Sequence, residues 1–148
     1  MAPLSWPLPQ PGLVIRYAYL WDREARSGRE ESAKDRPCAI ILVVLREGVS
    51  PAVRVLPVTH TSPDDPADAL EIPPLVKRRL GLDGERSWVM LTEANDFIWP
   101  GPDLRPAVSG ALSTAAHGFL PPGFLRVLRE RVVARAVMKR MQAVKRTP

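Results

Sequence analysis

Residues 35–63 read DRPCAIILVVLREGVSPAVRVLPVTHTSP, and this stretch decides the fold that we predict for the chain. Residues 38–45 form an unbroken apolar run rich in Ile and Val, and residues 53–58 form a second β-rich run. Gly48, Ser50 and Pro51 supply turn chemistry between the two runs. Because both runs are short and β-branched, the pattern predicts an antiparallel hairpin rather than a buried helix.

Polar side chains stand at both open ends of this predicted hairpin. Arg36 precedes the first strand, and Thr59, His60, Thr61 and Ser62 follow the second. In an antiparallel pair, the start of one strand lies beside the end of the next. We therefore expect the guanidinium and the hydroxyl groups to meet at one rim of a sheet, in a geometry that suits a phosphate.

The length and composition favour one soluble, mainly β domain. A chain of 148 residues is long enough for a single core, and its 45% apolar and 25% charged residues are ordinary for a globular protein. Its 17 prolines against 9 glycines predict many short segments, which suit β structure better than a helix bundle.

Cysteine and histidine content argues against a disulfide or a metal centre. Cys38 is the single cysteine and there are two histidines, so an internal disulfide is excluded and a structural zinc site is not expected. Cys38 stands inside an apolar strand, where we expect a buried, inert thiol. We predict no metal and no cofactor.

The net charge of +5 is unevenly placed along the chain. From Leu120 onward there are eight basic residues and one acidic residue, whereas 13 basic and 15 acidic residues precede that point. No run approaches the ~20 apolar residues that span a bilayer, and the N-terminus lacks the basic start and apolar core of a secretory signal. We therefore expect a cytoplasmic protein without a membrane partner.

The segments on the N-terminal side of the hairpin are a leader, a strand and a charged stretch. Residues 1–11 contain four prolines and are expected to be a disordered leader. Residues 13–21 alternate as a strand, with the bulkier Leu13, Ile15, Tyr17, Tyr19 and Trp21 on the buried face. Residues 22–35 are hydrophilic. A short helix there is allowed by propensity, but Gly28 and the position between two strands favour a long loop, which is either a lid over a site or a solvated connection.

Shorter elements and one long helix follow the hairpin. We predict strands over 69–72 and 87–92 and helical turns over 75–80. A further strand at 96–99 either extends the strand over 87–92 or follows it. Residues 118–141 are predicted as a helix that begins after two prolines. The side chains of its apolar stripe are Phe124, Leu125, Leu128, Val132 and Ala136.

The end of that predicted helix carries a second pattern. Arg135 and Lys139 interrupt the stripe, while Val133, Val137 and Met141 form another apolar line on the opposite side. We expect the first half to pack on the sheet and the second half to leave it. A dimer partner, a bound peptide or solvent could cover that second half.

Several motifs together resemble the MazF/PemK-like toxins of type II toxin–antitoxin systems, in the CcdB superfamily. The resemblance rests on a strand, a charged loop with Gly28 and Glu31, Arg36-Pro37 opening a β-branched strand, and Pro57-Val58-Thr59 closing the next. It implies an antiparallel SH3-like β-barrel with a C-terminal α-helix over residues 12–135. Beyond the part that matches the family, we predict a basic helix extension or tail over 136–148.

The same resemblance implies an activity and partners. Such proteins are cytoplasmic, metal-independent endoribonucleases that cut single-stranded RNA, inhibit growth, act as homodimers and are blocked by an antitoxin peptide. Arg36 matches the catalytic arginine and Thr59 the active-site threonine of the family. A guanidinium and a hydroxyl can stabilise the charge that builds on phosphate oxygens when a ribose 2′-OH attacks.

The group that moves the proton is left open between two residues. Glu93 resembles an acid that some family members use, and His60 is attractive because its ordinary pKa lies near neutrality. The RNA-binding residues that we predict are Glu31, Lys34, Thr61, Ser62 and Trp99.

Structural roles compete with each of these assignments. Arg36 could form a salt bridge with Glu31 or Asp35, Thr59 could cap a strand end, and Trp99 could pack in the core with the other aromatic residues. The competing function is a non-catalytic barrel that binds RNA or a protein partner.

Overall fold

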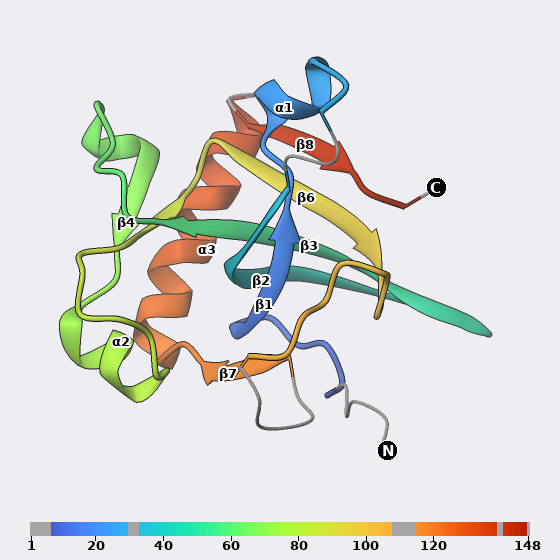
Figure 1. Ribbon diagram of the computed structural model, residues 1–148, viewed down its shortest axis with the longest axis horizontal. Helices are drawn as coiled ribbons and strands as arrows, with labels where there is room; N and C mark the ends of the chain where they lie inside the picture. Colours follow the sequence, from blue (N-terminus) through green and yellow to red (C-terminus); the bar gives the residue numbers. More distant parts are fainter. Residues whose placement is uncertain (1–6, 30–32, 108–114, 139–140, 148) are drawn as a thin grey trace.

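The structure is a computed structural model that describes residues 7–29, 33–107, 115–138 and 141–147. A twisted β-sheet forms most of the molecule, with a long helix packed against it (Figure 1). The strands are β1 (Leu13–Tyr19), β2 (Lys34–Arg46), β3 (Val49–Thr59), β4 (Ala69–Glu71), β5 (Trp88–Met90), β6 (Glu93–Ile98), β7 (Ala116–Phe119) and β8 (Gln142–Lys145). The helices are α1 (Asp22–Arg26), the 3₁₀ turn η2 (Pro66–Asp68), α2 (Pro74–Arg79) and α3 (Pro122–Val137).

The sheet runs in the order β4-β5-β3-β2-β1-β7, and β3 pairs along its outer edge with two strands. Ala52–Val55 of β3 pair with β6, and Val58 and Thr59 pair with β5. Every strand pair is antiparallel except β6 with β8. The prediction of a mainly antiparallel β fold with a C-terminal helix is confirmed. The strands of the described residues form an open sheet, so the closed SH3-like barrel is not confirmed.

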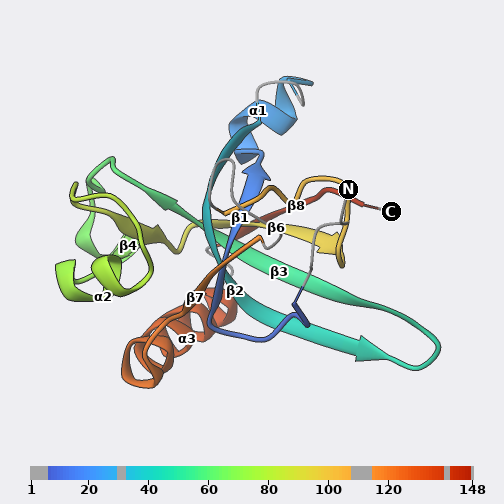
Figure 2. The ribbon, with the colours of Figure 1, turned by 60° about the horizontal axis from the view of Figure 1, so that its bottom comes forward.

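The β2–β3 hairpin is the longest part of the sheet and extends well beyond the body of the molecule (Figure 2). Gly48 adopts a φ of +74° in its turn, a value that favours glycine. The register pairs Cys38 with Pro57, and continuing it outward by two residues places Arg36 opposite Thr59. The predicted meeting of these two residues at one rim therefore follows directly from the strand register.

The two faces of the sheet bury separate clusters of side chains. Val14 and Leu56 belong to a core that faces α2 and α3, whereas Ile15, Tyr17 and Phe97 belong to a second core on the other face. Successive side chains of a strand point to opposite faces, so β1 contributes to both cores. This explains why β1 is buried on both sides instead of the single face predicted from its bulky residues.

The helix α3 is held by the apolar stripe that the sequence predicts. Leu128 is completely buried, and Phe124, Leu125 and Val132 pack against the same core. Arg135, which interrupts the stripe, donates to the carbonyl oxygen of Ala67 at 3.1 Å and pairs with Asp68 at 3.1 Å. The C-terminal end of α3 is therefore held against η2 by an ion pair and a hydrogen bond of Arg135 rather than by apolar packing. Val133 and Val137 are exposed, at 60% and 77%.

The segments before and after α3 differ from the prediction. The helix spans Pro122–Val137 rather than 118–141, because β7 pairs with β1 immediately before it. The predicted helix extension over 136–148 is wrong beyond Val137, since β8 pairs with β6. The guanidinium of Arg146 donates to the carbonyl oxygen of Ala18 at 2.8 Å and pairs with Asp103 at 3.3 Å. A basic tail residue is thus held inside the fold.

The N-terminal segments are only partly described. Residues 7–10 have no regular secondary structure, Pro11 begins a turn, and residues 1–6 of the predicted leader lie outside the described residues. The favoured loop over 22–35 contains the short helix α1, in which Asp22 and Arg26 form an ion pair one turn apart, at 3.0 Å. Among the described residues, no helix combines the length and the apolar character that crossing a bilayer requires.

Candidate functional site

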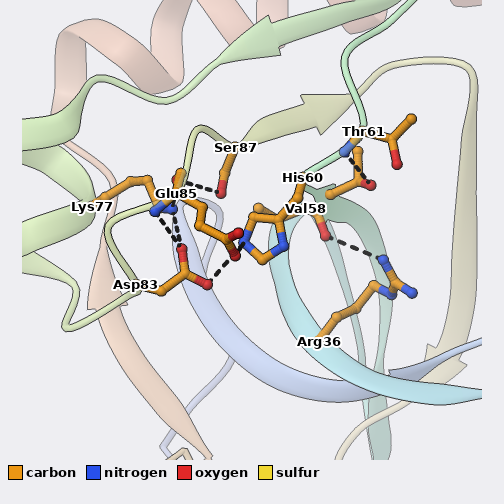
Figure 3. Close-up of polar contacts among 9 residues, drawn as sticks. Arg36, Val58, His60, Thr61, Lys77, Asp83, Glu85 and Ser87 are labelled. Atoms are coloured by element: carbon orange, nitrogen blue, oxygen red, sulfur yellow. Dashed lines mark hydrogen bonds and ion pairs between the residues drawn. The ribbon is translucent and has the colours of Figure 1, made fainter.

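A cavity of about 430 Å³ lies at the rim where β2 begins and β3 ends. This volume is in the range of small-ligand pockets. Four residues predicted for the site line it together: Lys34 and Arg36 from β2, Thr59 at the end of β3, and His60 just after it. Figure 3 shows the polar side chains around this rim. The hairpin register and the strand ends explain why these four residues converge.

The Arg36 guanidinium faces no carboxylate among the described residues. Its Nη1 makes only a long hydrogen bond to the carbonyl oxygen of Val58, at 3.5 Å, and its Nε is buried without a partner in the part of the chain described. The guanidinium carbon stacks over the Trp21 ring at 4.9 Å from the centroid. Stacking on an aromatic ring orients the planar group without neutralising it, so its charge remains available to an anion.

The salt-bridge alternative for Arg36 can be judged for one of its two proposed partners. The Asp35 carboxylate forms ion pairs with Arg16 at 3.7 Å and with Arg105 at 3.5 Å, and not with Arg36. Glu31, the other proposed partner and a predicted RNA-binding residue, lies outside the described residues.

Within the part of the chain that the structure describes, the Thr59 hydroxyl has one hydrogen bond. Its Oγ1 accepts from the backbone N–H of Thr61 at 3.1 Å, which is the strand-end cap proposed as its structural role. A hydroxyl that accepts can still donate its own proton, so Thr59 retains a donor for a bound oxygen. Thr61 and Ser62 are exposed beyond the strand end, outside the lining of the cavity.

His60 belongs to a hydrogen-bond network with the segment that follows α2 (Figure 3). Its Nε2 lies 2.8 Å from Oδ2 of Asp83 and 3.6 Å from Oε2 of Glu85. The other Asp83 oxygen, Oδ1, accepts from Nζ of Lys77 at 2.6 Å. Hydrogen bonding from Lys77 is the main cause that holds the pKa of Asp83 below its ordinary range. The network places an ionised carboxylate directly behind the imidazole.

The same cluster is the one place in the described chain where histidine and carboxylates could share a metal ion. Ligand atoms of His60, Asp83 and Glu85 lie within 4.8 Å of one another. However, the Lys77 ammonium already occupies one Asp83 oxygen, and a metal cation there would face that positive charge. We therefore interpret the cluster as a hydrogen-bond network.

The cavity residues that sequence reasoning missed include Arg16, Lys77, Asp83 and His117. They come from β1, α2, the loop after α2 and β7, and only tertiary pairing brings them together. Burial lowers the pKa of His117, so this second imidazole is neutral at pH 7. No spacing in the sequence links it or Asp83 to His60.

Glu93, the other candidate for proton transfer, lies outside the cavity lining. Its Oε1 accepts from the Tyr19 hydroxyl at 3.1 Å and from the backbone N–H of Asp22 at 2.9 Å. These contacts join β6 to the end of β1 and the start of α1, which is a structural role. Of the two residues left open, His60 is the one that faces the cavity.

A glutamine at position 93 should stabilise the protein near neutral pH. Burial raises the pKa of Glu93 above its ordinary 4.5, so its ionised form costs folding free energy that increases as pH rises through the raised pKa. Glu93→Gln keeps the oxygen that accepts both hydrogen bonds and removes the charge. We expect a higher free energy of unfolding than the wild type at pH 7 and no difference below about pH 4. Urea titrations at both pH values test this, and a loss of stability at pH 7 would contradict it.

Trp99 belongs to the core, as its packing alternative proposed. It is 7% exposed and stacks with Phe97, with ring centroids 6.0 Å apart. Its ring is not accessible to an RNA base, so Trp99 is corrected from an RNA-binding to a core residue. Cys38 is also fully buried, and burial raises the pKa of its thiol.

Comparison with known proteins adds no relative: no family model matches the chain, and no curated protein matches it. The resemblance to MazF/PemK-like toxins therefore stays a prediction that rests on the residues quoted for it. The toxin role, the antitoxin peptide and the homodimer are expectations of that resemblance and stay predictions too.

Proposed function

We propose that this protein is a metal-independent endoribonuclease that cleaves single-stranded RNA at the cavity between β2 and β3. The observation that carries the proposal concerns the Arg36 guanidinium. It forms no ion pair with a carboxylate among the described residues, and it lines the same cavity as Thr59 and His60. Four basic residues line the cavity (Arg16, Lys34, Arg36 and Lys77) against two acidic ones (Asp35 and Asp83), and this excess of positive charge favours a polyanion.

The proposed chemistry is attack of a ribose 2′-OH on the adjacent phosphate. Negative charge grows on the non-bridging oxygens in the transition state, where Arg36 and the Thr59 hydroxyl can donate hydrogen bonds. His60 is the group suited to accept the 2′-OH proton, because an imidazole titrates near neutral pH whereas arginine does not. These three residues supply stabilisation and proton transfer without a metal ion.

Purified protein should therefore cut a single-stranded RNA oligonucleotide in the presence of EDTA. The expected products are a fragment ending in a 2′,3′-cyclic phosphate, or its hydrolysis product, and a fragment beginning with a 5′-hydroxyl, both identified by mass spectrometry. The matched control is the same oligonucleotide with 2′-deoxyribose at the cleaved nucleotides, which should stay intact. Cleavage of the deoxy substrate, or intact RNA with correctly folded protein, would contradict the proposal.

A second candidate function is RNA binding without cleavage. It is favoured by the position of Glu93, whose carboxylate is engaged by Tyr19 and Asp22 and is absent from the cavity lining. In that case the RNA would be bound but intact in the same assay, and the affinity would fall steeply with salt because phosphate contacts release counterions.

A further inference from the structure

The two carboxylate oxygens of Asp83 have different partners. Oδ1 accepts from Nζ of Lys77 at 2.6 Å and from the backbone N–H of Glu85 at 3.1 Å. Oδ2 faces Nε2 of His60 at 2.8 Å. One oxygen is thus fixed by the scaffold, which leaves the other in a defined position against the imidazole.

Lys77 makes this arrangement rigid. Its side chain is only 5% exposed, and its ammonium donates to both Asp83 and the carbonyl oxygen of Glu85. A buried ammonium needs such partners, because an unpaired charge in the interior is costly. Lys77 therefore ties α2 to the loop that carries Asp83. Glu85 also approaches His60, but at 3.6 Å and with a side chain that is 74% exposed.

The hydrogen bond to Asp83 determines which imidazole nitrogen can act as a base. An ionised carboxylate only accepts, so the neutral ring must carry its proton on Nε2. Nδ1 then holds the free lone pair, and it has no hydrogen-bond partner among the described residues. In Figure 3 this second nitrogen lies on the side of the ring toward Arg36.

We propose that Asp83 is the positioning residue of His60, holding the ring in the Nε2–H form with Nδ1 presented to the cavity as the proton acceptor. This inference rests on the proposed function and extends it to two residues without an assigned role, Asp83 and its anchor Lys77. In the reaction, the 2′-OH proton passes to Nδ1 while the 2′-oxygen forms a bond to phosphorus. The 5′-oxygen leaves with the electron pair of its P–O bond and takes a proton from solvent.

The tautomer of His60 tests the assignment without any activity measurement. With two histidines in the chain, ¹⁵N-histidine labelling gives few signals, and the spectrum of His60→Gln identifies those of His60. At about pH 9, well above the ordinary histidine pKa, the ¹⁵N shifts should report a single Nε2–H form in the wild type. Asp83→Asn should populate the Nδ1–H form, because Lys77 and the backbone N–H of Glu85 hold the amide oxygen in the place of Oδ1, and the amide nitrogen then donates to Nε2.

Kinetics test whether this positioning matters for cleavage. Asp83→Asn is expected to lower kcat about 10- to 100-fold, at or below the lower end of the roughly 10²- to 10⁴-fold that a general base contributes, and to leave KM within about twofold. In a His60→Gln background, Asp83→Asn should cause no further loss, because a residue that acts through His60 has nothing left to position.

Glu71→Gln is the matched control for losing an ionic carboxylate in the same corner of the molecule. Glu71 pairs with Arg86 at 2.8 Å and does not line the cavity. This variant should keep the wild-type tautomer and kcat.

The possible results separate the two proposals. If the wild type does not cleave RNA, the proposed function fails, and the ¹⁵N shifts alone decide the role of Asp83. The Nδ1–H form in Asp83→Asn, with the Nε2–H form in the wild type and in Glu71→Gln, supports it. Two results would overturn it. One is that Asp83→Asn keeps the single Nε2–H form of the wild type. The other is that adding Asp83→Asn to His60→Gln lowers kcat by the same factor as Asp83→Asn does alone.

Discussion

Replacing Arg36 with lysine is expected to lower the kcat of RNA cleavage by about 100- to 1,000-fold, the usual loss when a donor to a developing oxyanion is removed. Lysine keeps the positive charge but loses the planar pair of N–H donors that a guanidinium offers to a phosphate. It also loses the stacking over Trp21 that orients the group. Because ground-state attraction to the phosphate is retained, KM should change by no more than about threefold. Steady-state cleavage of the single-stranded oligonucleotide measures both constants.

Arg86→Lys is a closely matched control for this substitution. Arg86 also stacks over a tryptophan, at 5.0 Å from the Trp88 centroid, but it pairs with Glu71 and does not line the cavity. Its replacement should leave kcat and KM within about twofold of the wild type. Equal losses in both variants would point to a general effect of removing stacked guanidinium groups. An unchanged kcat in Arg36→Lys would remove Arg36 from the proposed site.

The central hairpin could be predicted because its determinants are local. β-branched runs on both sides of Gly48 specify two strands and a turn, and their register follows from the apolar pattern and the turn between them. The meeting of Arg36 and Thr59 at one rim is a consequence of that register. The apolar stripe around Leu128 was predictable for the same reason, since its period belongs to one continuous helix.

The elements that were missed depend on partners far away in the sequence. β7 and β8 have four residues each, too few for a periodic pattern, and they exist as strands because β1 and β6 offer free edges. Arg146 stands in the predicted basic extension or tail, but its hydrogen bonds reach Ala18, 128 positions away, and Asn95, 51 positions away. Such contacts have no signature in the local sequence.

The residues of the candidate site also divide into those that local sequence could predict and those that depend on distant pairing. Arg36, Thr59 and His60 flank strands that were predicted, so their convergence was accessible to sequence reasoning. Asp83 follows a short helix whose last turn, Lys77 to Arg79, reads as a solvated basic face. Only the pairing of β3 with β5 brings that loop beside His60, and only burial distinguishes Lys77 from its neighbours.

Replacing Leu128 with alanine is expected to lower the free energy of unfolding by about 3 kcal/mol, within the 2–5 kcal/mol usual for large-to-small changes in a core. Leu128 is fully buried where α3 meets the core that contains Leu56 and Leu91. The loss combines the transfer of the missing methyl groups with the cavity that they leave. For a domain of this size, it corresponds to a fall in Tm of about 6–12 °C.

Val133→Ala on the same helix is the control that separates packing from helix propensity. Val133 is 60% exposed, so its truncation should change the free energy of unfolding by no more than about 0.5 kcal/mol. Alanine is the better helix former, and any propensity effect is therefore stabilising in both variants. Urea unfolding followed by circular dichroism compares the two. Losses of similar size would mean that the exposed line of α3 is covered in solution, whereas a small loss at Leu128 would contradict the packing of α3 on the sheet.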